Sequence, residues 1–223
     1  MKIIAFSLWG DDPRYTLGAL QNVSLAKLVY PDWICRFYVG KSTPEHIVDL
    51  LFEFDNVEII PMPEEGDWTG MFWRFKAASD PKMEALIVRD CDSRLWFREK
   101  AAVDEWLSSD KQFHIMRDNE QHTTPILGGM WGVKGGFLRD IEKQIDAYRQ
   151  EDYWQIDQEF LKEVLYTQVR DKALVHDPFF ERRPFPTTER DPNHFVGQAY
   201  AGSGKILDQE EYFQEFMRRE IGV

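Results

Sequence analysis

The sequence predicts an α/β domain in which helices flank a mostly parallel, Rossmann-like sheet. Strand-like apolar runs alternate with helix-like segments, a pattern typical of parallel strands with helices on both faces. The first run, Ile3 to Leu8, is apolar as expected of a strand buried on both sides. No Gly/Ser-rich linker and no internal repeat interrupts the chain, so we expect a single domain over residues 1–223.

The elements follow one another in a regular order. Helix-like segments show apolar residues at near-helical spacing, with Pro31 as a stop and Thr43 and Pro44 as a start. The expected strands are Ile3–Leu8, Ile34–Val39, Val57–Ile60 and Glu84–Arg89, and the expected helices are Tyr15–Tyr30, Pro44–Phe54 and Asp208–Glu220.

The composition argues against several kinds of partner. The chain has 27 Lys and Arg against 39 Asp and Glu, a net charge of −12, and so acidic a surface repels nucleic acids and anionic membranes. No apolar stretch approaches the roughly 20 residues that span a bilayer, and the N-terminal run stops at Asp11-Asp12-Pro13, which favours a buried strand over a signal peptide. Cys35 and Cys91 are too few for a disulfide framework or a cysteine zinc site, so we expect a reducing, cytoplasmic setting.

A pair of acids follows the fourth expected strand. Asp90 and Asp92 stand at its carboxyl end, the edge at which open α/β sheets bind ligands. Two acids one residue apart can face one Mg²⁺ or Mn²⁺ ion, which would bridge the phosphates of a substrate. The alternative is a turn whose Asp residues cap the next helix.

Basic residues surround this pair. Arg89 and Arg94 flank it directly, and guanidinium groups suit phosphate oxygens. Residues 70–100 hold seven Lys and Arg against five Asp and Glu, so this window carries +2 while the remainder carries −14. We interpret the window as a positive region for an anionic substrate.

Two later segments indicate a sugar pocket. Gly128 and Gly129 lie in a strand-like run that continues to Trp131; paired glycines let a ligand approach the backbone, and a Trp can stack on a sugar ring. The alternative is a β-bulge against an aromatic core. Asp157 and Gln158 open an apolar-periodic helix, where the alternative role of Asp157 is a first-turn acid favoured by the helix dipole.

The strand ending in Asp90-Cys91-Asp92, together with Ser93-Arg94-Leu95 and the upstream segment Trp68–Phe75, resembles the nucleotide-sugar-dependent glycosyltransferases of the GT-A fold, distantly those similar to glycogenin and the lipopolysaccharide galactosyltransferases. The resemblance runs over roughly Lys2 to Tyr200. It implies a GT-A-like domain that moves a sugar from a UDP- or GDP-sugar to a hydroxyl of a glycan or polysaccharide, with Mn²⁺ or Mg²⁺. It implies that Phe6, Ser7 and Trp9 lie near the nucleotide base and that Asp90 has a ribose or metal role. With the candidates for the donor phosphates or sugar, Arg74, Arg89 and Arg94, these are the predicted donor residues.

The same resemblance assigns further roles. Asp90 and Asp92 would hold the metal with His176, or alternatively His194, as third ligand. Gly128, Gly129, Trp131 and Gln158 would form the sugar and acceptor pocket, and Asp157 would be the catalytic carboxylate. The chain departs from the relatives at Leu127-Gly128, where they usually carry Asn, and at Gln198–Tyr200, where they carry Lys-Pro-Trp.

Rival functions remain open from the sequence. A haloacid-dehalogenase-like phosphatase also uses Asp-x-Asp after a strand, but after an early one. A non-catalytic carbohydrate-binding module would use Trp68, Trp73 and Trp131 as stacking platforms and would not need the three acids. A nucleotidyltransferase needs a glycine-rich, basic first loop, whereas Trp9–Asp12 is acidic.

Overall fold

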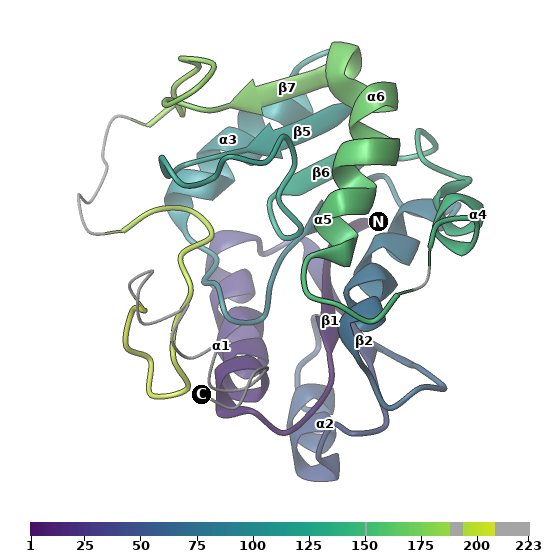
Figure 1. Ribbon diagram of the computed structural model, residues 1–223. Coiled ribbons are helices and arrows are strands. Elements are labelled where there is room, and N and C mark those ends of the chain that lie inside the picture. Colours follow the sequence, from purple (N-terminus) through teal and green to yellow (C-terminus); the bar gives the residue numbers. More distant parts are fainter. Residues whose placement is uncertain (150, 188–193, 208–223) are drawn as a thin grey trace.

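The computed structural model describes residues 1–149, 151–187 and 194–207, which form an α/β domain (Figure 1). The predicted helix at Asp208–Glu220 lies outside these residues. One seven-stranded sheet runs in the order β3-β2-β1-β4-β6-β5-β7. Neighbouring strands pair in parallel except where β6 pairs with β4 and β5, so the predicted mostly parallel sheet is confirmed. The strands are β1 (Lys2–Leu8), β2 (Trp33–Val39), β3 (Val57–Pro61), β4 (Ala85–Val88), β5 (Phe113–Met116), β6 (Trp131–Lys134) and β7 (Ala173–His176).

Helices cover both faces of the sheet. Residues of α1, α2 and α3 pack with one core, and residues of η1, α4, α5, η2 and α6 pack with the other. These elements are α1 (Pro13–Val29), α2 (Glu45–Phe52), the 3₁₀ helix η1 (Trp68–Ser79), α3 (Phe97–Ser108), α4 (Ile141–Asp146), α5 (Ile156–Phe160), the π-helical turn η2 (Leu161–Leu165), α6 (Tyr166–Val169) and the 3₁₀ turn η3 (Arg170–Lys172).

Strand β1 shows how the two cores form. Ile3 and Ala5 belong to the core beneath η1, whereas Ile4 and Phe6 belong to the core beneath α1, because successive side chains of a strand point to opposite faces. The next residue on the η1 side is Ser7, whose hydroxyl accepts a hydrogen bond from the backbone N–H of Arg74 at 3.1 Å. The pleat therefore directs a polar residue, not Phe6, toward the helix that carries Arg74.

The predicted strands and helices up to β4 are present within one or two residues at each end, and η1 forms in a segment for which no element was predicted. The predicted helix Tyr15–Tyr30 is α1, which begins two residues earlier because the Asp12 side chain accepts from the N–H of Arg14 and Pro13 fits the first turn. The segment from Trp68 forms η1, with the Asp67 side chain accepting from the N–H of Thr69.

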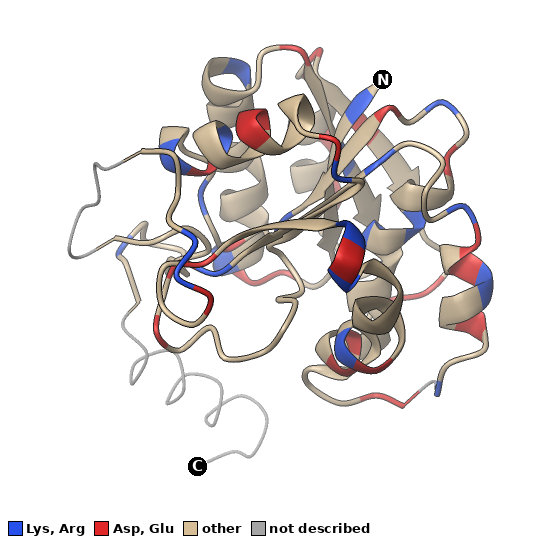
Figure 2. Cartoon of the chain, turned by 90° about the horizontal axis from the view of Figure 1, so that it is seen from above, with Lys and Arg blue, Asp and Glu red and all other residues tan. Residues whose placement is uncertain are grey.

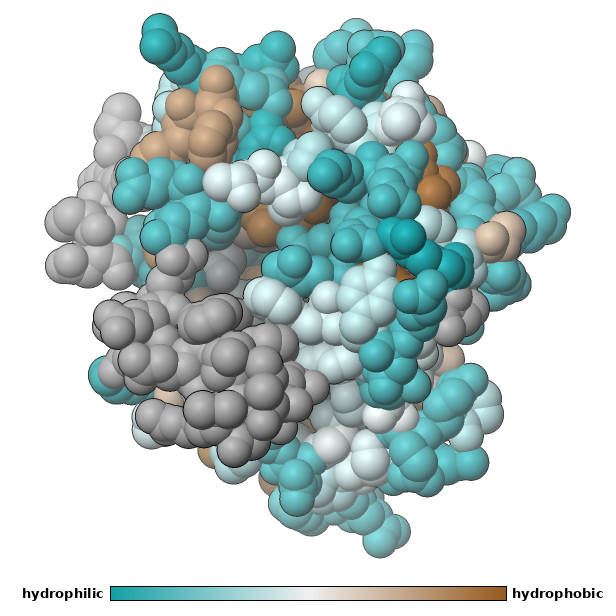
Figure 3. Space-filling model, viewed as in Figure 1, coloured by the Kyte–Doolittle hydropathy of each residue, from teal (hydrophilic) through white to brown (hydrophobic). Residues whose placement is uncertain are grey.

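Two surface findings complete the fold. The face seen in Figure 3 is largely hydrophilic, with smaller apolar areas between the polar side chains. None of the helices in the described ranges has the length and apolar character needed to cross a bilayer.

Candidate active site

A cleft of about 1710 Å³ lies at the carboxyl ends of β1 and β4. Ser7 and Trp9 line it from the end of β1, and Asp90 and Asp92 line it from the turn after β4. The opposite walls come from the start of η1 and from residues 119–128, 152–162 and 195–207. The sheet edge that the sequence indicated as the ligand site is therefore hollowed.

One buried arginine joins two carboxylates in this cleft. Arg74, 2% exposed, donates from Nη1 to Asp90 Oδ1 and from Nη2 to Asp157 Oδ2, the latter at 3.2 Å. Its Nε is buried and has no hydrogen-bond partner within the described part of the chain. The structure thus brings together three predicted site residues from η1, the turn after β4 and α5, and it leaves one guanidinium donor for another acceptor.

Glycines make this approach possible. A Cβ on Gly128 would lie 2.5 Å from Asp157 Oδ2 and 2.9 Å from an Arg74 nitrogen, and one on Gly129 would lie 2.0 Å from Asp90 Oδ2. None of these distances leaves room for a side chain at either position. Both glycines lie in the turn before β6, not within a strand as predicted, and the groups they approach are the carboxylates of the site itself.

Burial and like charge shift the carboxyl groups of the site. Burial, reinforced by the charge of Asp90, raises the pKa of Asp92 to about 7, while Arg14 and Arg94 oppose this shift. Burial also raises the pKa of Asp157, and the neighbouring Arg74 opposes it. Desolvated carboxylates of this kind cluster at functional sites more than elsewhere.

Arg14 was not among the predicted site residues. It is buried at the start of α1 and lines the cleft, where its charge acts on Asp92. The available signal was its place just after the first strand, at the edge where ligands bind. The structure adds Arg14 to the predicted cleft residues Ser7, Trp9, Arg74, Asp90, Asp92, Gly128, Asp157 and Gln158.

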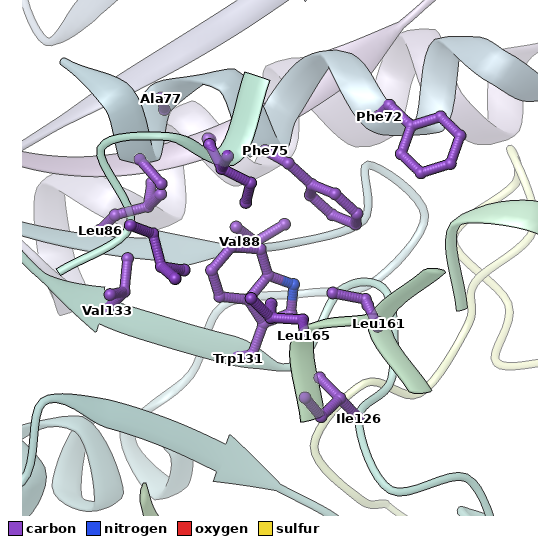
Figure 4. Packing of buried hydrophobic residues seen from close by; sticks show 14 of the residues in the cluster. Phe72, Phe75, Ala77, Leu86, Val88, Ile126, Trp131, Val133, Leu161 and Leu165 are labelled. Carbon is purple, nitrogen blue, oxygen red and sulfur yellow. The ribbon is translucent and has the colours of Figure 1, made fainter. Parts of the chain in front are cut away.

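Two predicted aromatic ligands are core residues. Trp131 is fully buried, with its ring stacked 5.3 Å from Phe113 and edge-on to Phe75 at 5.2 Å (Figure 4). Phe6 is equally buried and stacks on Phe37 at 4.8 Å. Neither lines the cleft, because each side chain points from the sheet into one of the two cores.

The predicted positive region is corrected as well. Arg89 is buried and donates to Glu99 at 3.3 Å and to the Trp131 carbonyl at 3.4 Å. Arg94 donates to the carbonyls of Cys91 and Ser93, and its guanidinium lies 4.7 Å from the centre of the Tyr200 ring. Arg74 is the one predicted arginine that lines the cleft.

The predicted third metal ligand lies elsewhere. His176 is buried at the end of β7, with its Nδ1 2.8 Å from His114 Nε2 and its Nε2 3.3 Å from Glu105. The other candidate, His194, lies 2.7 Å from the Tyr200 hydroxyl. Neither lines the cleft, and the described residues contain no group of three or more His, Cys, Asp and Glu side chains arranged to hold a metal.

Of the predicted metal ligands, the residues in the cleft that could hold a cation are Asp90 and Asp92. Mg²⁺ and Mn²⁺ accept one or two carboxylates and complete their coordination with water and substrate phosphates. Two carboxylates at the mouth of a cleft fit such an ion, and they do not form a closed protein site for it.

Solved structures share this architecture. The glycosyltransferase involved in the glycosylation of the major capsid of PBCV-1 superimposes with a TM-score of 0.52 at 17% identity, over 79% of this chain and 81% of the other. The mannosyltransferase PcManGT from Pyrobaculum calidifontis, solved with GDP-Man and Mn²⁺, gives 0.52 at 10% identity, over 82% of this chain and 58% of its own.

The fold is of the GT-A type. The predicted fold class is therefore confirmed. The chain also superimposes on 4-diphosphocytidyl-2C-methyl-D-erythritol synthase from Anaerococcus prevotii, with a TM-score of 0.54 at 10% identity, over 84% of this chain and 93% of the other. No protein-family model matches the sequence, and the search of curated proteins finds no match. At these identities the likeness shows the GT-A fold, and the chemistry has to be argued from the cleft.

Proposed function

We propose that this chain transfers a sugar from a nucleotide-diphosphate sugar to a hydroxyl group of a glycan. The observation that carries the proposal is the bridge from Asp90 through Arg74 to Asp157. The Arg74 guanidinium connects Asp90, in the turn suited to a metal-bound diphosphate, with the buried carboxylate of Asp157 on its other side. A donor whose phosphates lie at Asp90 and Asp92 would extend its sugar toward Asp157.

A divalent cation, Mn²⁺ or Mg²⁺, would be held by Asp90 and Asp92. When bound, it would neutralise the charge that develops on the departing diphosphate. The GT-A mannosyltransferase solved with GDP-Man and Mn²⁺ supports this choice of cofactor. Arg74 Nε–H, buried without a partner in the described ranges, would donate a hydrogen bond to an oxygen of the nucleotide sugar.

Asp157 has two possible tasks, which correspond to the two stereochemical outcomes. In an inverting reaction its carboxylate accepts the proton of the acceptor hydroxyl while that oxygen bonds to the anomeric carbon and the diphosphate leaves with its bonding electrons. In a retaining reaction it positions the sugar and stabilises positive charge on the ring. Both tasks require the ionised form, which the Arg74 contact favours against the effect of burial.

A donor-hydrolysis assay tests the proposal. Full-length protein is incubated with Mn²⁺ and a panel of UDP- and GDP-sugars, with and without oligosaccharides. Release of free or transferred sugar together with nucleoside diphosphate is the expected result. Release of inorganic phosphate would instead indicate the phosphatase. Release of pyrophosphate from a nucleoside triphosphate would indicate a nucleotidyltransferase, and glycan binding without turnover would indicate the binding module.

The structure bears on the binding module directly. Trp73 is 5% exposed and Trp131 is fully buried, so two of its three proposed platforms cannot contact a glycan. Trp68 alone of the three lines the cleft.

A further inference from the structure

Three apolar side chains in the cleft lining come from two segments near Asp157, and together we call them the apolar wall. Trp68 and Met71 line the cleft from η1, and Trp154 lines it from the loop that leads into α5. The two segments are joined where the N–H of Trp68 donates to Asp152 Oδ1 at 2.9 Å. η1 also carries Arg74, and the second segment leads to Asp157, which Arg74 contacts. Both segments of the wall therefore continue to the proposed reaction centre.

The cleft is large enough for a second substrate. Pockets for a single small ligand usually measure about 300–1,000 Å³, and this cleft measures about 1710 Å³. Indole rings and a Met side chain present flat or adaptable apolar surface, on which the C–H faces of sugar rings pack. Trp68, Met71 and Trp154 therefore form a suitable surface for the acceptor.

The cleft around this wall is acidic. Its described lining contains nine Asp and Glu but three Lys and Arg, namely Arg14, Arg74 and Lys162. Arg74 is already bonded to two carboxylates. Asp67, Glu120 and Asp152 stand exposed along the rim. Figure 2 shows acidic positions on several of the loops that connect the elements.

We propose, on the basis of the proposed function, that the wall of Trp68, Met71 and Trp154 is an acceptor subsite for an uncharged or amine-bearing sugar. The acidic rim excludes sugars that carry carboxylate, sulfate or phosphate groups. A donor diphosphate paired with a divalent cation adds little net charge, so the acceptor meets the negative field of the lining. Like-charge repulsion then disfavours an acidic acceptor, and specificity arises from what the site repels as well as from what it contacts.

Binding to matched glycans tests this subsite. Full-length protein with Mn²⁺ is applied to an array on which each neutral oligosaccharide has an amine and a carboxylate counterpart of the same linkage. We expect neutral and amine forms to bind and carboxylate forms to bind about tenfold more weakly at low salt, a difference that shrinks in 0.5 M NaCl. Trp68→Ala and Trp154→Ala should lose binding, whereas Phe52→Ala, which removes a 66% exposed ring from α2, should not.

Charge variants separate the rim from overall acidity. Asp67→Asn and Asp152→Asn keep the acceptor oxygens that cap η1 and hold Trp68, and with Glu120→Gln they remove three charges from the rim. This triple variant should reduce the discrimination against carboxylate glycans severalfold. The same loss of charge outside the cleft, on exposed residues at or beside α2, should leave it unchanged; that control is Glu45→Gln, Asp49→Asn and Glu53→Gln.

Several results would overturn the subsite. They are equal or tighter binding of carboxylate glycans, binding that survives both Trp substitutions, and the absence of any bound glycan. Each leaves sugar release from the nucleotide sugar in place. Failure of the proposed function would instead abolish that release, so the two failures are distinguishable.

Discussion

Replacing Arg74 by Met tests how much the buried ion pair with Asp157 contributes to the stability of the folded protein. The substitution keeps an unbranched side chain but leaves Asp157, which is 1% exposed, without its cation. Removing one partner of a buried ion pair costs about 3–5 kcal/mol, because the other charge stays buried and uncompensated. We expect urea denaturation in EDTA at pH 8 to show a loss of that size. The surface pair Arg149–Glu159 supplies the control, since its partners are 41% and 44% exposed and Arg149→Met should cost about 1 kcal/mol or less.

The pH dependence of the loss identifies its cause. Without Arg74 the pKa of Asp157 in the folded protein rises further above its unfolded value, so the folded state binds the extra proton as the pH falls. The difference between Arg74→Met and the wild type should therefore shrink between pH 8 and pH 5. Adding Asp157→Asn should restore part of the stability, with a coupling of about 1–3 kcal/mol. Additive effects within about 0.5 kcal/mol, or a difference independent of pH, would refute the reasoning.

Three further changes test other parts of the site. Gly128→Ala should lower kcat by about a hundredfold, measured as nucleoside diphosphate release, because its Cβ would meet Asp157 Oδ2 at 2.5 Å; near-normal kcat would contradict this. Asp92→Asn should remove Mn²⁺-dependent binding of UDP and GDP in calorimetry, and unchanged metal dependence would count against the donor set. Burial lowers the pKa of His122 to about 4, so its unfolded form takes up a proton first and stability should fall by about 2 kcal/mol from pH 7 to pH 5. His122→Asn keeps an acceptor for the Asp118 N–H and should make the stability nearly independent of pH between 7 and 5. Denaturation midpoints at both pH values measure this, and an unchanged pH dependence in the variant would contradict it.

The sheet was predictable because its signals are local. The predicted strands at Ile34–Val39 and Val57–Ile60 match β2 and β3 to within one residue at each end, since apolar runs bounded by Gly and Pro leave few other options. The order β4-β6-β5 was not predictable, because antiparallel insertion of β6 depends on pairing between residues distant in sequence. Placement of Asp90 at the cleft followed from the carboxyl end of β4 alone.

Aromatic residues show where the sequence stops being informative. The sequence assigned Trp131 to the sugar pocket, and Trp68 only to the alternative binding module. The deciding difference is the face on which each lies: Trp131 begins β6 and points into a core, whereas Trp68 begins η1 at the mouth of the cleft. That face is set by tertiary packing, and a single Trp carries no periodicity from which to read it.

The basic residues of the predicted positive region were wrongly assigned to the substrate for a related reason. Their actual placement inside the protein supports the proposal that a metal ion accompanies the substrate. A count of charges along the sequence does not reveal which charges are paired in the folded protein. Arg89 is paired with Glu99, and Arg98 with Asp118 at 2.8 Å, and both pairs are buried. These cations are therefore unavailable to the cleft, whose described lining holds nine acids against three Lys and Arg. A diphosphate entering such a field would be repelled unless a cation from solution accompanied it. Nucleotide affinity should thus rise steeply with Mn²⁺ concentration, and a nucleoside without phosphates should bind with little dependence on the metal.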